Sequence, residues 1–362
     1  MWNFRHRLRL AVYAAALPLL GLTAACGASA TAGGGTPGPG GAGAVIKLAD
    51  PGNSGPLAYA KREGILEKRL GAVGARVEWG GSYASFTATI DAVRSGSVNV
   101  LEGAISPALG YLANSSDIKI FSFTDRVTAK EAPYEDGLVV PASSSVRSVR
   151  DLVGKQVAVN KGGRGEYLLL LALKEAGIPA GQVKRVHLNP VQGASAFATG
   201  KVDAWWAIVR AYPEVVAKGA RVLVHGRDLP EKDLNIWAAR TELIERHPAA
   251  VRTFLDVLRE LVQQEKDSPE RFQNVFLKQG PTAVSGARLA EEIAKARHQN
   301  VPRPARQADG EYVRAVAGVF RENGVLPAGI DPRNVIAEPG GGGAPSSAPA
   351  SPASPAASET AR

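Results

Sequence analysis

Cysteine is nearly absent from this chain of 362 residues, which contains only Cys26. No disulfide can form within the chain, so a small disulfide-stapled scaffold is excluded and the fold has to rely on the packing of apolar side chains. Histidine is also scarce, and the spacing of the four later histidines matches no paired set of metal ligands. These four are His187, His225, His247 and His298. We expect neither a metal site nor a cofactor.

Signatures of catalysis and of nucleic-acid binding are missing as well. The sequence has no serine nucleophile elbow, and the glycine-rich stretch 162–165 lacks the Lys-Ser/Thr ending of a phosphate-binding loop. Aromatic residues make up 6% of the chain and the basic residues are dispersed, which argues against a nucleic-acid partner. The formal net charge of +9 suits an anionic ligand or an anionic membrane surface, and composition does not choose between them. We expect a protein that is not an enzyme.

Long apolar runs are confined to the N-terminus. Arginines at positions 5, 7 and 9 precede the run Leu10–Leu22, which is shorter than the roughly 20 residues needed to span a bilayer. The run ends in Thr-Ala-Ala-Cys-Gly at 23–27, a small-residue cleavage site that contains the single cysteine. This pattern is typical of a bacterial lipoprotein, although Thr23 stands where leucine is most common. We predict that residues 1–25 are a lipoprotein signal peptide and that Cys26 becomes the lipidated N-terminus; the alternative is an ordinary signal peptide, with Cys26 an incidental thiol.

Both ends of the remaining chain are poor in bulky side chains. Residues 26–43 and 338–362 consist mainly of Gly, Ala, Pro, Ser and Thr. Such segments bury too little apolar surface to offset the entropy that ordering would cost. We predict a flexible tether after the lipidated cysteine and a disordered C-terminal tail. The core between them, 44–337, is long enough for two ordinary domains.

The core alternates short apolar runs with longer helical patterns, which predicts an α/β fold with mainly parallel sheets. The pattern restarts near Gly137, and a strand that begins at Asn235 is expected to return to the first lobe. The predicted strands are 45–49, 76–79, 98–101, 138–140, 156–160, 183–188, 203–208, 220–224 and 235–239. We therefore predict lobe 1 from 44–137 plus 235–337 and lobe 2 from 138–234. Two chain crossings then form a hinge, with a ligand cleft between the lobes.

The loops that follow the predicted strands are small, polar and rich in glycine, and ligands bind at this edge of open α/β sheets. Glycine-rich turns at helix N-termini present free N–H groups and a partial positive charge, which suit a sulfonate or a carboxylate. Taken singly, each loop is equally consistent with a turn or a helix cap. The residues expected to line the wall of lobe 1 are Asn53, Ser54, Gly55, Gly81, Ser82, Tyr83, Gly103, Ala104 and Ser106, and those of lobe 2 are Gly162, Gly163 and Arg164.

Several segments resemble one family in their order and spacing. Residues 146–162 read VRSVRDLVGKQVAVNKG, residues 197–205 read FATGKVDAW, and residues 235–240 read NIWAAR. Together they resemble the substrate-binding proteins of the aliphatic-sulfonate, taurine and nitrate ABC importers, across nearly the whole core. The resemblance implies a type II periplasmic-binding-protein fold, capture of a small organic anion by cleft closure, and delivery to a membrane permease driven by a separate ATPase. It also implies a lipid-anchored monomer on the extracytoplasmic face of the cell membrane.

Two departures from the family pattern bear on the ligand. Many sulfonate binders continue the Asp-Ala-Trp motif with Trp-Asp-Pro, whereas residues 206–213 carry no carboxylate, and Ala104 stands where relatives often have aspartate. Two partners for a cationic group are therefore missing, and Arg210 can add a bidentate contact to an anion. We favour an anion without an essential amine over taurine. Trp205 and Trp206 can wall off an organic ligand, and since neighbours on a strand face opposite ways, only one is expected to reach the cleft.

Two further hypotheses remain open. The resemblance extends to binders of a thiamine-pyrimidine precursor or another heterocycle. The thiamine-pyrimidine synthases share this fold but use a cysteine-rich motif, and the mature chain has only Cys26. A sensory binding protein that presents its closed state to a receptor is the other alternative, because one fold supports several functions.

Overall fold

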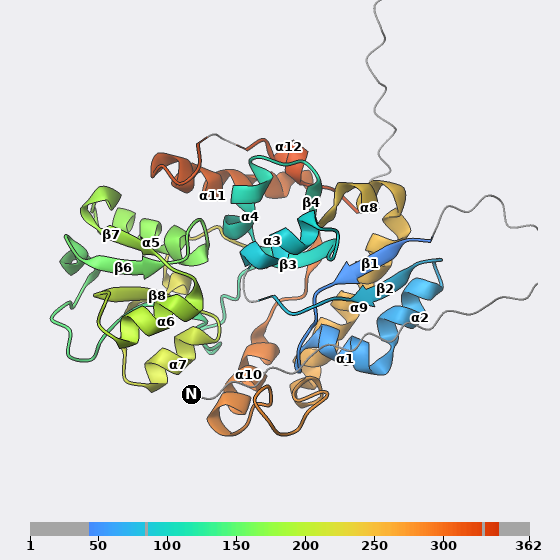
Figure 1. The fold of residues 1–362 in the computed structure, drawn as a ribbon, viewed down its shortest axis with the longest axis horizontal. Helices are drawn as coiled ribbons and strands as arrows, with labels where there is room; N and C mark the ends of the chain where they lie inside the picture. Colours follow the sequence, from blue (N-terminus) through green and yellow to red (C-terminus); the bar gives the residue numbers. More distant parts are fainter. Residues whose placement is uncertain (1–42, 84–85, 328–329, 340–362) are drawn as a thin grey trace, which may run out of the picture. The chain divides into compact units, whose positions relative to one another are not determined.

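The computed structural model describes residues 43–83, 86–327 and 330–339 (Figure 1). All of them belong to one compact unit, Ala42–Arg362. The predicted signal peptide, Cys26, most of the tether and nearly all of the C-terminal tail lie outside the described residues. None of the helices described is long and apolar enough to cross a membrane.

A short parallel sheet begins the fold, with β1 paired in register to β2. Helices α1, α2 and α9 pack on it, and Ile46 and Leu48 of β1 are buried among them. Gly64 separates α1 from α2 in a left-handed conformation (φ 63°), which glycine adopts without steric cost. The bounds are β1 Val45–Leu48, α1 Pro56–Glu63, α2 Ile65–Gly71, β2 Arg76–Trp79 and α9 Pro248–Asp267.

A four-stranded sheet follows, in the order β11-β4-β10-β3. Neighbouring residues on a strand point to opposite faces of the sheet, and different helices cover the two faces. Leu101 and Ile236 belong to the core cluster that contains the buried side chains of α4 and α11, whereas Val100 and Trp237 belong to the cluster around α9. The bounds are α3 Phe86–Arg94, β3 Val100–Ala104, α4 Ile105–Leu112, β4 Ile118–Thr124, β10 Asn235–Arg240, β11 Arg303–Pro304 and α11 Gly310–Glu322.

A five-stranded sheet, in the order β7-β6-β8-β5-β9, forms the remaining layer. Helix α5 shares a core cluster with Trp206, and α6 and α7 share another with Trp205, so the helices cover both faces. The bounds are β5 Asp136–Val140, β6 Gln156–Val159, α5 Arg164–Glu175, β7 Lys184–His187, α6 Pro190–Ala198, β8 Ala204–Ile208, α7 Ala211–Ala217 and β9 Arg221–Val224.

The prediction of mainly parallel sheets is wrong for much of the structure. Strands β1 and β2 are parallel, as are β6 and its neighbours β7 and β8. The other pairings are antiparallel. The reason lies in the two chain crossings: β5 and β10 each enter a sheet directly after a crossing, and each runs opposite to both strands beside it.

The two larger sheets are connected twice by the chain. The chain leaves β4 at Thr124 and enters β5 at Asp136, and it returns from η3 (Gly226–Asp228) to β10 at Asn235. The largest cluster of buried apolar residues nevertheless continues from α4 and α11 to α5, where Tyr167 meets Phe320 edge to face. The described residues of the two sheets therefore share a core.

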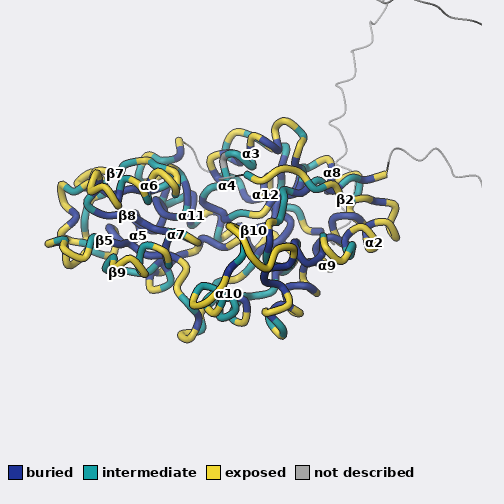
Figure 2. The backbone as a smooth tube through the Cα atoms, turned by 60° about the horizontal axis from the view of Figure 1, so that its bottom comes forward, coloured by how far each residue is buried: buried dark blue, intermediate teal, exposed yellow. Residues whose placement is uncertain are grey.

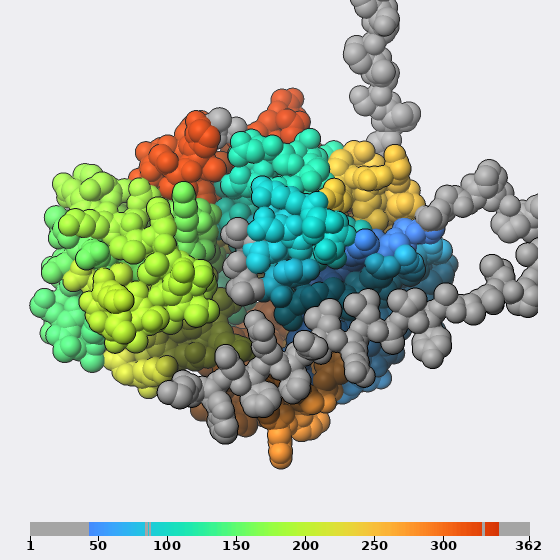
Figure 3. Space-filling view, viewed as in Figure 1, coloured from blue at the N-terminus to red at the C-terminus, as the bar shows by residue number. Residues whose placement is uncertain are grey.

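The remaining elements are short or peripheral, apart from α10, which lines the site described below. Figure 2 shows buried residues concentrated along the strands and the covered faces of the helices, and Figure 3 shows α5 to α7, in green to yellow-green, and α3 and α4, in cyan, on one face. The bounds are η1 Val149–Leu152, η2 Ala180–Gln182, α8 Thr241–Arg246, η4 Pro269–Phe272, α10 Gly286–His298, η5 Gln307–Asp309 and α12 Pro332–Val335.

Candidate ligand cavity

A cavity of about 530 Å³ is lined by both chain crossings, by strands of both larger sheets and by helices α9 and α10. This volume is in the range of small-molecule sites in proteins, roughly 300–1,000 Å³. Part of the wall is apolar and part is charged. The apolar part includes Pro56, Leu57, Ile208, Trp237, Leu258 and Val262, and the charged part consists of Glu102, Asp125, Arg126, Glu135, Asp136, Arg164, Arg227, Glu231, Asp233 and Lys295.

Strand direction explains why these residues meet. The cavity takes Thr124 from the carboxyl end of β4 and Ile208 from that of β8, the edge where open α/β sheets bind ligands. Strands β5 and β10 run the opposite way, so they bring their first residues, Asp136 and Asn235, to the same edge. The crossing segments attached to these ends complete the wall.

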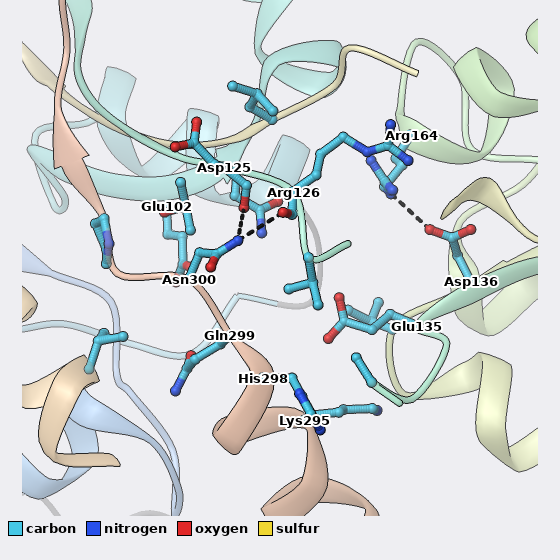
Figure 4. A pocket seen from close by; sticks show the side chains of 18 of the residues that line it. Glu102, Asp125, Arg126, Glu135, Asp136, Arg164, Lys295, His298, Gln299 and Asn300 are labelled. Carbon is cyan, nitrogen blue, oxygen red and sulfur yellow. Dashed lines mark hydrogen bonds and ion pairs between the residues drawn. The ribbon is translucent and has the colours of Figure 1, made fainter. Parts of the chain in front are cut away.

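Arg164 is the centre of a buried charge network on one side of the cavity (Figure 4). Its guanidinium contacts Asp136 at 3.0 Å, Glu231 at 2.7 and 2.8 Å in a bidentate pair, and Asp233 at 3.5 Å. Arg126 adds a contact to Glu231 at 3.2 Å. Because these groups satisfy one another, the guanidinium of Arg164 is already committed before any ligand arrives.

Burial has the largest effect on the pKa values of the acidic groups in this network. It raises the pKa of both Glu231 and Asp233, against the opposing charge of Arg164. Asp233 also accepts hydrogen bonds from the backbone N–H and the hydroxyl of Ser106, at 2.8 and 2.6 Å. For Arg164, burial acts to lower the pKa, but the three carboxylates outweigh it and raise the pKa. The carboxylates of the network therefore keep their charge through pairing with Arg164 and Arg126.

Two carboxylates and one imidazole of the cavity wall have no hydrogen bond or ion pair to any described residue: Glu102, Glu135 and His298. Burial raises the pKa of Glu102 to about 7, and it also raises the pKa of Glu135, against the nearby charges of Lys295 and Arg164. Both carboxylates still face open space, because their side chains are exposed to the cavity. Figure 4 shows Glu102, Glu135 and His298 around this space.

The other cationic groups of the wall already have partners. Lys295 pairs with Glu291 at 3.1 Å. Arg227 donates to the carbonyl oxygens of Ala129 and Ala132 at 3.0 and 2.8 Å, and its guanidinium lies 4.0 Å from the centre of the Tyr134 ring. Among the described residues, no group of three or more His, Cys, Asp and Glu side chains could hold a metal ion.

Val209 is a strained residue at the edge of the cavity. It follows β8, lines the cavity and has φ of 44°, in the left-handed region that β-branched residues rarely adopt. Such a conformation costs on the order of 1–3 kcal/mol and persists only where the surroundings impose it. Arg210, the next residue, is exposed, lies outside the cavity wall and is the N-cap of α7.

The sequence-predicted residues of the first loop are mostly structural. Ser54 lines the cavity, whereas Asn53 is turned toward the 276–282 segment. The Asn53 side chain accepts from the backbone N–H groups of Phe276 and Leu277 at 2.8 and 2.9 Å and donates to the carbonyl of Leu277 at 2.8 Å. The N–H of Gly55 donates to the carbonyl of Phe272 at 2.8 Å. These bonds hold the loop after β1 against η4 and the residues that follow it.

The second and third loops do not reach the cavity wall. Gly81, Ser82 and Tyr83 lie outside it, as do Gly103, Ala104 and Ser106. A hydroxyl contact at 3.2 Å joins Ser82 to Asp50, and Gly103 packs directly under the ring of Phe86, which leaves no room for a side chain. Ser106 does not line the cavity, but it donates hydrogen bonds to Asp233, which does.

The glycine-rich turn before α5 has its N–H groups occupied. Gly162 donates to the carboxylate of Glu166 at 2.7 Å, and Gly165 donates to the side-chain oxygen of Asn160 at 3.0 Å. Gly163 donates to the backbone carbonyl of Asn160. In this arrangement Gly162 and Gly163 lie outside the cavity wall, and Arg164 is the residue of the turn that lines it.

The two tryptophans of β8 face opposite sides of the sheet, as predicted, but neither lines the cavity. Trp206 is 1% exposed beneath α5, and Trp205 is 3% exposed and packs against Phe197 of α6. Because helices cover both faces of this sheet, each ring enters a core. Glu166, a carboxylate in the first turn of α5, is buried and binds Arg185 at 2.9 Å.

Sequence reasoning missed most of the charged wall. The missed residues lie in or beside the crossings, where the sequence has compact charge pairs such as 125–126 and 135–136 and the acidic positions 231 and 233. A signal was present, since charged residues beside a buried strand need partners. Their partners lie 28 to 69 residues away, however, and Lys295 and His298 come from α10, so local spacing could not connect them.

Comparison with known proteins places the chain in a family. A family model described as NMT1/THI5 like matches residues 87–271. The taurine-binding periplasmic protein of Escherichia coli (strain K12) is 29% identical over 241 residues, which are 65% of this chain and 69% of that protein.

Solved structures agree on the fold. The alkanesulfonate-binding protein SsuA from Xanthomonas axonopodis pv. citri, bound to MOPS, superposes with a TM-score of 0.70 at 22% identity, covering 82% of this chain and 99% of that chain. The desulfurization enzyme DSZB superposes with a TM-score of 0.52 at 15% identity, covering 82% and 96%, so the architecture also carries an enzyme. The match to more than half of the sequence and the agreement of the folds lead to one conclusion: this chain belongs to the NMT1/THI5-like family and has the periplasmic-binding-protein fold.

Proposed function

We propose that this chain is the lipid-anchored, extracytoplasmic substrate-binding component of an ABC importer and that the cavity holds its ligand. One observation carries the proposal: both crossings and the strand ends of both larger sheets build the cavity wall. A ligand there contacts both predicted lobes, 44–137 plus 235–337 and 138–234. It can favour a closed arrangement only through contacts that differ between the two states.

The ligand is a small organic molecule in this proposal. The names of the taurine-binding and alkanesulfonate-binding relatives favour an aliphatic sulfonate, the class that the sequence also favours. A specific observation favours a second class, an amine or a basic heterocycle: the free ionisable groups on the described wall include two carboxylates, Glu102 and Glu135. The two classes differ in charge, so one experiment separates them.

Ligand-dependent stabilisation of the purified full chain tests the binding function. A ligand at 100 times its dissociation constant adds about 2.7 kcal/mol to the free energy of unfolding, which a thermal-shift assay detects. Small-angle scattering in the presence of the same ligand then tests closure, with a smaller radius of gyration as the expected result. A chain that no small organic sulfonate, carboxylate, amine or heterocycle stabilises would contradict the binding function.

The lipid anchor rests on the pattern at 23–27 and needs a separate test. We expect Cys26→Ser to move the protein from the membrane fraction to the soluble fraction, because it removes the acylated thiol. Ser29→Ala, three residues further on, is the matched control and should stay with the membrane. An unchanged distribution of Cys26→Ser would argue for the ordinary signal peptide.

A further inference from the structure

We infer that the ligand of this cavity carries a positively charged nitrogen and that Glu102 is the side chain that receives it, with Glu135 supplying a second negative charge across the cavity. The inference rests on the proposed binding function and narrows its ligand class. The inferred ligand differs from a sulfonate because the charged residues on the described wall favour a positively charged ligand.

The position of Glu102 is set by the sheet. Glu102 follows Val100 on the same face of β3 and lies directly opposite Trp237 of β10 in the register. Both side chains line the cavity, and the apolar residues Leu258 and Val262 of α9 lie on the same wall. The aromatic ring and the aliphatic surface offer this carboxylate no hydrogen-bond partner, so a ligand cation can pair with it without competition from the protein. The face of Trp237 can add a cation–π contact.

The balance of charge on the wall favours a cation over an anion. Six carboxylates line the cavity against four Arg and Lys side chains. In the part of the chain that the structure describes, each of these four cations already holds a carboxylate or a backbone carbonyl. A sulfonate in the cavity would therefore share these cations with their present partners, or bind His298, while facing Glu102 and Glu135. A protonated amine meets two carboxylates that need no rearrangement.

A further carboxylate, that of Glu265, interacts electrostatically with Glu102. Glu265 of α9 is 5% exposed, and its pKa is raised to about 7 by burial, with added repulsion from Glu292 and Glu102. Gln299 donates a hydrogen bond to its carboxylate and is the neutral partner there. Because the charge of Glu102 acts on Glu265, a cation beside Glu102 also offsets this repulsion.

The test compares three sets of probes matched in size: n-alkylammonium compounds, n-alkanesulfonates and n-alkanols of the same chain length, with taurine as the zwitterion. Each is measured by thermal shift and calorimetry on the full chain, on Glu102→Gln and on Glu135→Gln. Glu175→Gln is the matched control, since Glu175 is an exposed residue of α5 outside the cavity wall. Glutamine keeps the shape of glutamate, removes its charge and replaces one acceptor oxygen by an NH2 donor.

The expected result is stabilisation by the ammonium compounds and not by the sulfonates or alkanols of equal length. Glu102→Gln should weaken ammonium binding by about 30-fold or more, the loss typical of removing one partner of a desolvated charge pair. Glu135→Gln should weaken it less, and Glu175→Gln should leave it within twofold. Taurine should bind through its amine and lose affinity in Glu102→Gln.

Two outcomes overturn the inference, and they can be told apart. If alkanesulfonates stabilise the chain and Glu102→Gln leaves their affinity unchanged or increases it, the charge assignment is wrong while the binding function stands. If these probes are silent and a carboxylate or an uncharged heterocycle stabilises the chain, the charge assignment is again wrong and the binding function stands. If none of these classes stabilises the chain at any concentration short of aggregation, the proposed binding function fails and the inference fails with it.

Discussion

Removing the guanidinium of Arg164 should destabilise the protein far more than removing a surface arginine. The three carboxylates around Arg164 have side chains 7%, 2% and 0% exposed, for Asp136, Glu231 and Asp233. Breaking a buried ion pair by deleting one partner costs about 3–5 kcal/mol, because the other charge stays buried without compensation. With three carboxylates sharing one guanidinium, we expect Arg164→Ala to fall at the upper end of that range at pH 8.

The pH dependence gives this prediction a second signature. Burial already raises the pKa of Glu231 and Asp233 above that of the unfolded chain, and the loss of Arg164 removes the charge that opposes this rise. The folded variant then binds protons more tightly than the unfolded chain, so acid favours its folded state. The loss of stability in Arg164→Ala should therefore be smaller at pH 5 than at pH 8.

Urea unfolding followed by tryptophan fluorescence at both pH values measures the effect. Arg164→Met keeps the apolar stem of the side chain and separates the loss of charge from the loss of packing. Arg69→Ala is the matched control: Arg69 pairs with Glu260 at 2.8 Å, but both side chains are more than 40% exposed, so we expect a loss of at most about 1 kcal/mol. A loss in Arg164→Ala no larger than in this control would refute the reasoning.

Three further predictions concern single positions. Gly193→Ala should lower the free energy of unfolding by about 1–3 kcal/mol, because the added Cβ would lie 2.8 Å from Nε1 of Trp205; Gly181→Ala, with open space around it, should be near neutral in the same denaturation assay. Val209→Gly should raise stability by up to about 1 kcal/mol by removing backbone strain at φ 44°, and an unchanged or lower midpoint in urea would contradict that account. Burial raises the pKa of the Glu102 carboxyl to about 7 in the folded chain. The folded state therefore binds a proton here more tightly than the unfolded chain, and this proton stabilises the fold fully below pH 4.5. The stabilisation is lost as the pH rises to about 7 in the protein without ligand. Unfolding curves of Glu102→Gln should lack this loss, and a pH profile identical to that of the unsubstituted chain would count against it.

Local patterns predicted many of the secondary-structure elements. The strands at 45–49, 76–79 and 156–160 differ from β1, β2 and β6 by at most one residue. Glycine was a dependable signal, as Gly64 and Gly177 end helical segments with positive φ. Strand β4 was missed because both of its faces are covered, which leaves a nearly continuous run of buried residues without the alternation of a half-exposed strand.

The candidate site was less accessible to prediction than the fold. Of the residues expected to line the cleft, Ser54 and Arg164 lie on the cavity wall. A glycine-rich turn indicates free N–H groups only if no neighbour accepts from them, and here Asn160 and Glu166 take those of the turn before α5. Such local competitors are visible in the sequence, but their orientation is not.

By itself, the sequence determined the class of the protein: the alternation of strand and helix patterns and the ordered segments from 146 to 240 indicated the fold and the family that the comparisons then found. These features depend on neighbours within a few positions of each other, which periodicity and spacing record directly. Only the tertiary structure decided which charges meet. Arg164 joins carboxylates 28, 67 and 69 positions away, while Glu102 is left facing the cavity without a partner among the described residues. Pairing of buried charges depends on distance in space, and so the electrostatic character of the cavity appears only once both crossings are in place.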